Sequence, residues 1–233
     1  MRILSPTLLP LFVACFSLCI QHATAQAPMV ELKFITFPQS QEPLEMELVV
    51  SEDKTLKLEI PSNELSETYR VPRLSKLVFG ESEVDDEGKF KFNIFGQGAM
   101  ASGKKQIVLI LRKGKELSAG FQVRALSSDT DAFGGGKFLF LNATSKPISG
   151  IAGKQRFALK SGNHSILKPV AEREDRLTFV EFYYFDQEQQ PVNFFKSWWP
   201  VDKNTRGLIF FYQDPMRDNK ITFHSYRDFL IKD

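Results

Sequence analysis

Apolar and polar residues alternate along much of the chain. The alternation is clearest at residues 30–37 (VELKFITF), 44–50 (LEMELVV), 55–60 (TLKLEI) and 89–95 (KFKFNIF). A period of two places every apolar side chain on one face of an extended chain, whereas a helix would scatter these side chains around its axis. These four segments are therefore predicted to be β-strands with one buried face.

Three further segments are apolar almost throughout, at residues 107–111 (IVLIL), 177–185 (LTFVEFYYF) and 207–212 (GLIFFY). Such runs are typical of strands that are covered on both faces or lie centrally in a sheet. Turn-forming stretches such as KSGN and DPMRDN separate the strands. Long helices are not expected after the N-terminal region, and only NELSETY, from Asn63, could form a single helical turn.

Short strands separated by regular turns predict an all-β fold built from antiparallel, immunoglobulin-like β-sandwiches. A polar, glycine-rich stretch, SSDTDAFGGG, lies near the middle of the chain. We expect two tandem sandwich domains at residues 26–127 and 137–233, with residues 128–136 as the linker. The alternative is one larger sandwich in which this stretch is an internal crossover loop.

Segments of the two halves resemble each other at a shift of about 100 residues. The segment that begins at Lys105 resembles the one at Arg206, since each places an apolar strand, a charged turn and an alternating strand in the same order. The segment from Thr55 parallels the one from Lys154 in the same way. These similarities support two related domains.

The N-terminus has the plan of a secretory signal peptide. Arg2 precedes an apolar stretch at residues 8–20, and Ala23 and Ala25 provide the small residues of a cleavage site. The apolar stretch is shorter than the roughly 20 residues that cross a bilayer. We therefore expect a signal peptide at residues 1–25 and a secreted or periplasmic protein with no membrane span in its mature chain.

Composition excludes several kinds of chemistry. Both cysteines, Cys15 and Cys19, fall in the predicted signal peptide, so the mature chain is expected to contain no disulfide, thiol nucleophile or cysteine-bound zinc. The formal net charge is +2, with charged residues making up 25% of the chain. This balance gives no electrostatic reason to expect nucleic acid as a partner.

The stretch FGGGKFLFLNAT at residues 133–144 comes closest to a known ligand motif. A phosphate loop requires Ser or Thr after its lysine and a helix that follows, whereas here a phenylalanine and a strand follow. Asp129 and Asp131 begin like a calcium-binding EF-hand loop, but Phe133 and Phe140 occupy ligand positions. Neither a cofactor nor a metal is therefore predicted.

No catalytic residue is predicted, and the protein is expected not to be an enzyme. His164 and His224 each lie directly beside a serine in strand-like sequence, and no serine has the neighbours of a nucleophile elbow. The acidic cluster at residues 81–87 (Glu81, Glu83, Asp85, Asp86 and Glu87) is interpreted as a solvated hairpin loop. The alternative is an extracellular polymer hydrolase, which would need two carboxylates roughly 5 to 10 Å apart in a cleft.

An aromatic cluster, VNFFKSWWPVD at residues 192–202, is the candidate binding surface. Neighbouring side chains of a strand point to opposite faces, so either Trp198 or Trp199 should face outward or into a crevice. An exposed tryptophan can stack on a sugar or anchor a protein. We predict that Trp198, Trp199 and Phe195 bind a protein, cell-envelope or glycan partner. The alternative is that one ring closes the core and the other is covered.

Part of the second half resembles a family of uncharacterised exported proteins of Verrucomicrobia and Planctomycetes. The resemblance rests on a pattern of two phenylalanines, an asparagine, a hydroxyl residue and two turn glycines, matched by Phe138, Phe140, Asn142, Thr144, Gly153 and Gly162. It departs at Ser161, where a proline often precedes the glycine. The resemblance implies an exported bacterial β-protein and no particular activity.

Overall fold

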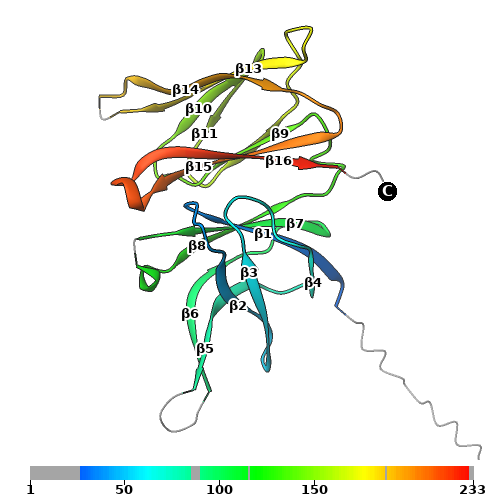
Figure 1. Ribbon diagram of the computed structural model, residues 1–233, viewed down its shortest axis with the longest axis vertical. Helices are drawn as coiled ribbons and strands as arrows, with labels where there is room; N and C mark the ends of the chain where they lie inside the picture. The colour runs from blue at the N-terminus through cyan, green and yellow to red at the C-terminus, as the bar shows by residue number, and fades with distance from the viewer. Residues whose placement is uncertain (1–26, 85–89, 115, 187, 231–233) are drawn as a thin grey trace, which may run out of the picture.

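The computed structural model describes residues 27–84, 90–114, 116–186 and 188–230 (Figure 1). Within these ranges the chain forms sixteen strands and two short 3-10 helices, Leu117–Ala119 and Pro215–Arg217, and no α-helix. The all-β prediction is therefore confirmed. The predicted signal peptide, with Cys15 and Cys19, lies outside the described residues, as do Asp85, Asp86 and Glu87. No helix among the described residues is long and apolar enough to cross a membrane.

The first half of the chain forms two four-stranded sheets. The first outer sheet has the strand order β3-β2-β5-β6, and the first inner sheet has the order β4-β1-β7-β8. The strands are β1 (Met29–Phe37), β2 (Leu44–Ser51), β3 (Lys54–Ile60), β4 (Tyr69–Pro72), β5 (Leu77–Val84), β6 (Phe90–Gly98), β7 (Lys105–Arg112) and β8 (Phe121–Ser127). All neighbours are antiparallel except β1 and β7, which are parallel.

The second half repeats this order. Its inner sheet is β12-β9-β15-β16 and its outer sheet is β11-β10-β13-β14, with β9 and β15 parallel. The strands are β9 (Phe138–Asn142), β10 (Ile148–Ala152), β11 (Gln155–Leu159), β12 (His164–Leu167), β13 (Leu177–Phe185), β14 (Pro191–Pro200), β15 (Thr205–Asp214) and β16 (Lys220–Phe229). The two pairs of similar segments occupy equivalent places, at β7–β8 with β15–β16 and at β3–β4 with β11–β12.

The four sheets form successive layers, with the second outer sheet at the top of Figure 1 and the first outer sheet at the bottom. Three apolar cores fill the three spaces between the layers. The middle core joins the two inner sheets and includes Phe37, Leu109, Phe133, Leu208 and Phe210, all nearly inaccessible to solvent. Because the inner sheets are covered on both faces, β7 and β15 are buried along almost their whole length.

The glycine-rich stretch between β8 and β9 is tightly packed. Phe133 enters the middle core, and its carbonyl accepts a hydrogen bond from the buried Arg206 side chain. A side chain at Gly135 would overlap the backbone carbonyl of Lys203. The close approach of two backbone segments therefore explains the glycine at position 135.

The structure corrects the expectation at Asn63 and gives Asn142 a role in the fold. The helical turn considered at Asn63 is wrong, because residues 61–68 form an irregular connection whose Ser66 hydroxyl accepts a hydrogen bond from the backbone N–H of Phe34. Asn142 is fully buried, and its amide donates hydrogen bonds to the carbonyls of Lys146 and Leu159. The asparagine of the exported-protein pattern therefore fixes the turn that follows β9.

Candidate functional site

The two tryptophans of β14 lie on opposite faces of the second outer sheet. Trp198 pairs with Phe179 of β13, and Trp199 pairs with Thr178. Since neighbouring residues of a strand alternate, Trp198 faces away from the core and Trp199 faces toward it. The structure thus separates the two predicted binding rings.

Trp198 lies on the outer surface and is 42% exposed. Its ring meets the edge of Phe179 with centroids 5.4 Å apart, and the guanidinium carbon of Arg173 lies 5.3 Å from its ring centroid. Arg173 also forms an ion pair of 3.2 Å with Asp175. These contacts hold an exposed aromatic ring in a defined orientation while leaving part of it accessible.

Trp199 and Phe195 pack against the core of the second half. A bulge opposite Phe182 and Tyr183 inserts one extra residue, so that Phe194 and Phe195 both turn inward. Phe195 stacks on Phe182 at 5.3 Å, and Trp199 lies 5.6 Å from Phe195. Phe195 and Trp199 are therefore neighbours of each other and not of the exposed Trp198 surface.

Trp199 also lines a small pocket of about 280 Å³ at one end of the second half. Phe138 forms another wall, and Thr205, Gly207 and Ile209 contribute the β15 side. The remaining lining residues are Pro200, Ser225, Tyr226 and Arg227. Sequence reasoning missed Ser225 and Arg227, because only strand pairing brings β16 beside β15 and Trp199.

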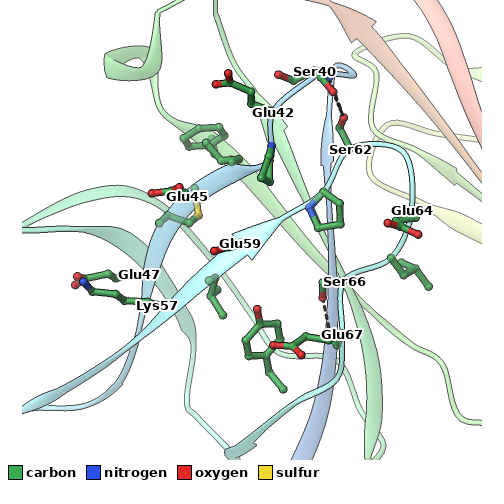
Figure 2. Close-up of a pocket in the computed structure, with 18 of the residues that line it drawn as sticks. Ser40, Glu42, Glu45, Glu47, Lys57, Glu59, Ser62, Glu64, Ser66 and Glu67 are labelled. Atoms are coloured by element: carbon green, nitrogen blue, oxygen red, sulfur yellow. Dashed lines mark hydrogen bonds between the residues drawn. The ribbon is translucent and has the colours of Figure 1, made fainter.

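A larger groove of about 1160 Å³ lies on the first half (Figure 2). It is lined by the β1–β2 connection, by β2 and β3, and by the β3–β4 connection. Seven glutamates line it, whereas Lys57 is the single basic lining residue. The glutamates are Glu42, Glu45, Glu47, Glu59, Glu64, Glu67 and Glu81. Sequence reasoning treated only Glu81 as part of an acidic cluster and missed the others.

The groove combines this acidic lining with apolar side chains, among them Leu56, Leu58 and Tyr69. Burial raises the pKa of the Tyr69 phenol, a backbone hydrogen bond with Glu59 lowers it, and the charge of Glu67 raises it further. Six of the seven glutamates are exposed, and the seventh, Glu47, is half-buried and accepts a hydrogen bond from the Ser82 hydroxyl. Within the groove there is thus no buried carboxyl group of the kind that a glycosidase uses as its acid.

Two other residues that were considered as ligands from the sequence, Asp129 and His224, make contacts within the fold. The Asp129 carboxylate accepts hydrogen bonds from the backbone N–H groups of Lys104 and Lys105, which joins the linker to β7. His224 packs against Phe37 at 5.1 Å, and burial lowers the pKa of its imidazole. In the described parts of the chain, no group of three or more His, Cys, Asp or Glu side chains is placed to hold a metal ion.

Comparison with known proteins gives no family assignment. No protein-family model and no curated protein sequence matches this chain.

Proposed function

We propose that the protein is exported and acts as a non-catalytic binding protein that holds its partner through the aromatic surface around Trp198. The observation that carries this proposal is the exposed Trp198 ring, held between Phe179 and Arg173 on the outer sheet. An ordered aromatic ring loses little conformational entropy when it binds. The partner is a protein, a component of the cell envelope or a glycan.

The surroundings of Trp198 support a fixed recognition surface. Glu181, two residues from Phe179 on β13, accepts a hydrogen bond of 2.9 Å from the Asn193 side-chain amide. A hydrogen bond with Glu181 is the main cause that raises the pKa of Tyr183. Polar groups further along β13 and β14 are thus held by one another, which favours recognition of a specific partner over nonspecific apolar contact.

A tandem pair of immunoglobulin-like domains is part of the same proposal. The repeated strand order of the two halves supports it, and such sandwiches commonly carry binding surfaces without catalytic sites. The boundaries at residues 26–127, 128–136 and 137–233 stay predictions, as does the immunoglobulin-like identity.

The test is affinity capture from a cell-envelope extract, combined with a glycan array, with wild-type protein and two variants. Trp198→Ala should weaken capture by roughly 30-fold or more, because a central aromatic anchor contributes about 2 kcal/mol or more. Met216→Ala removes another exposed apolar side chain, 55% exposed, and should leave capture unchanged. Equal capture by wild type and Trp198→Ala would refute the proposal.

The glutamate-lined groove is the observation that favours the alternative, an extracellular polymer hydrolase. None of its glutamates is buried, however, whereas the acid of a glycosidase lies in a buried, apolar site. Incubation with a panel of chromogenic polysaccharides tests this alternative directly. Turnover that is lost in Glu47→Gln or Glu59→Gln variants would establish it in place of the binding function.

A further inference from the structure

The pocket beside Trp199 is separate from the Trp198 surface because the two rings point to opposite faces of β14. Trp199 and Phe138 supply aromatic walls whose centroids are 5.8 Å apart in an edge-to-face arrangement. A side chain at Gly207 would clash with the Phe138 ring, so the glycine allows this ring to pack closely against β15 as a wall of the pocket. The volume of about 280 Å³ is just below the range typical of drug-sized ligands and suits a single six-membered ring with its substituents.

Three residues that line the pocket carry hydrogen-bond donors. These donors are the Arg227 guanidinium, the Ser225 hydroxyl and the Trp199 indole N–H. None of them forms a hydrogen bond with another residue that the structure describes. Arg227 pairs with Gly207 across β15 and β16, and both residues line the pocket. The polar lining thus offers donors to a ligand that is rich in acceptors.

The charge of Arg227 is not neutralised by its neighbour Asp228. Successive side chains of β16 alternate between faces, and Asp228 lies on the opposite face, where it binds Arg206 at 2.8 Å. Arg227 forms no ion pair within the described part of the chain. A guanidinium beside an aromatic wall is suited to a carboxylate carried on a ring, since it can form two parallel hydrogen bonds with the carboxylate.

We propose that this pocket binds one carboxylated sugar ring, such as the uronic acid unit of an acidic glycan. The ring lies against Trp199, its carboxylate pairs with Arg227, and its hydroxyl groups bond with Ser225 and Thr205. The glutamate-lined groove of the first half would repel such a ligand, so acidic glycans are expected at the second half alone. This inference does not depend on the Trp198 surface.

Fluorescence titration of the Trp198→Phe protein tests the proposal, because Trp199 is then its single tryptophan. Methyl glucuronide is expected to change the Trp199 emission saturably, with at least tenfold weaker binding for methyl glucoside, which lacks the carboxylate. Sodium benzoate, a ring carboxylate without hydroxyl groups, should also bind at least tenfold more weakly. Equal binding of the glucuronide and the glucoside, or preferred binding of benzoate, would overturn the proposal.

Arginine variants separate a specific site from general charge attraction. Arg227→Gln should weaken glucuronide binding at least tenfold, whereas Arg217→Gln, at an exposed arginine far along β15 and β16 from the pocket, should leave it unchanged. Both side chains are exposed, and matched thermal unfolding of the two variants controls for folding. If Arg227→Gln and Arg217→Gln bind the glucuronide equally well, Arg227 does not hold the carboxylate and the proposal is overturned. Loss of partner capture in Trp198→Ala with intact glucuronide binding would distinguish this site from the proposed aromatic surface.

Discussion

Replacement of Arg206 by methionine should destabilise the fold strongly. The Arg206 guanidinium binds the Asp228 carboxylate through two nitrogens, each 2.8 Å from Oδ2. It also donates hydrogen bonds of 2.7 Å to the carbonyls of Ser128 and Phe133, and it lies over the Phe133 ring at 4.7 Å. One side chain therefore joins the linker, β15 and β16.

The magnitude follows from burial. The side chains of Arg206 and Asp228 are only 8% and 10% exposed. Removal of one partner of a buried ion pair leaves an uncompensated charge, which costs about 3–5 kcal/mol. The two carbonyls that lose their donor contribute to that cost, since each unsatisfied buried acceptor costs about 1–3 kcal/mol on its own. We expect Arg206→Met to lower the free energy of unfolding by about 4 kcal/mol, a large part of the stability of an ordinary domain.

Urea unfolding followed by circular dichroism measures this loss. The matched control is Arg70→Met, which breaks an ion pair of 3.1 Å to Glu31 whose side chains are 74% and 32% exposed, and this should cost less than about 1 kcal/mol. Replacement of both buried partners, Arg206→Met with Asp228→Leu, should recover part of the loss because no charge is left buried. A loss below about 1 kcal/mol for Arg206→Met would refute the reasoning.

Three further predictions concern the core. Burial lowers the pKa of His224 below its unfolded value of 6.5. The contribution of the neutral imidazole to the free energy of unfolding should therefore be fully present above pH 6.5 and be lost as the pH drops through the lower folded pKa. Unfolding at pH 7.5 and pH 5 should therefore differ more in wild type than in His224→Gln. The Thr178 hydroxyl is buried and forms no hydrogen bond with any residue that the structure describes, so Thr178→Val should raise the free energy of unfolding by about 1 kcal/mol, measured in urea. Phe37→Ala in the middle core should cost about 3–5 kcal/mol, as much as Phe79→Ala in the first-half core, if the halves are as tightly packed against each other as each is internally.

Most of the strands were predictable because alternation reports one-sided burial directly. The segment at residues 177–185 coincides with β13, which lies between β10 and β14 in its sheet as its apolar character indicated. The alternating segment at residues 30–37 was predicted to be half-buried, but β1 is buried on both faces from Phe34 to Phe37. The second inner sheet covers its other face, and local periodicity carries no information about such a distant layer.

The candidate site was predictable in part for a related reason. The alternation rule separates Trp198 from Trp199 without any knowledge of the fold. The pocket beside Trp199 depends on Ser225 and Arg227, which strand pairing brings from β16. The groove glutamates are spread over residues 42–81 and meet only because β2, β3 and their connections surround one space. Neither cavity follows from the spacing of residues along the chain.

The repeat provides an internal comparison for the tryptophans. Strands β6 and β14 are equivalent, and each carries a bulge, at Phe95 in β6 and Phe194 in β14. Counted from the bulge, Ala99 and Met100, which directly follow the end of β6, correspond in sequence to Trp198 and Trp199. The environments agree, since Ala99 is exposed and Met100 packs against its core.

The same sandwich is thus built without a tryptophan at either place. The fold does not require an exposed indole at Trp198, so Trp198→Ala should lower the free energy of unfolding by less than about 1 kcal/mol, as is usual for a surface substitution that creates no cavity. Urea unfolding of this variant beside Phe182→Ala, which empties a fully buried site and should cost about 3–5 kcal/mol, tests the comparison. A large loss for Trp198→Ala would mean that packing explains the ring, and the proposed binding surface would then lose its main support.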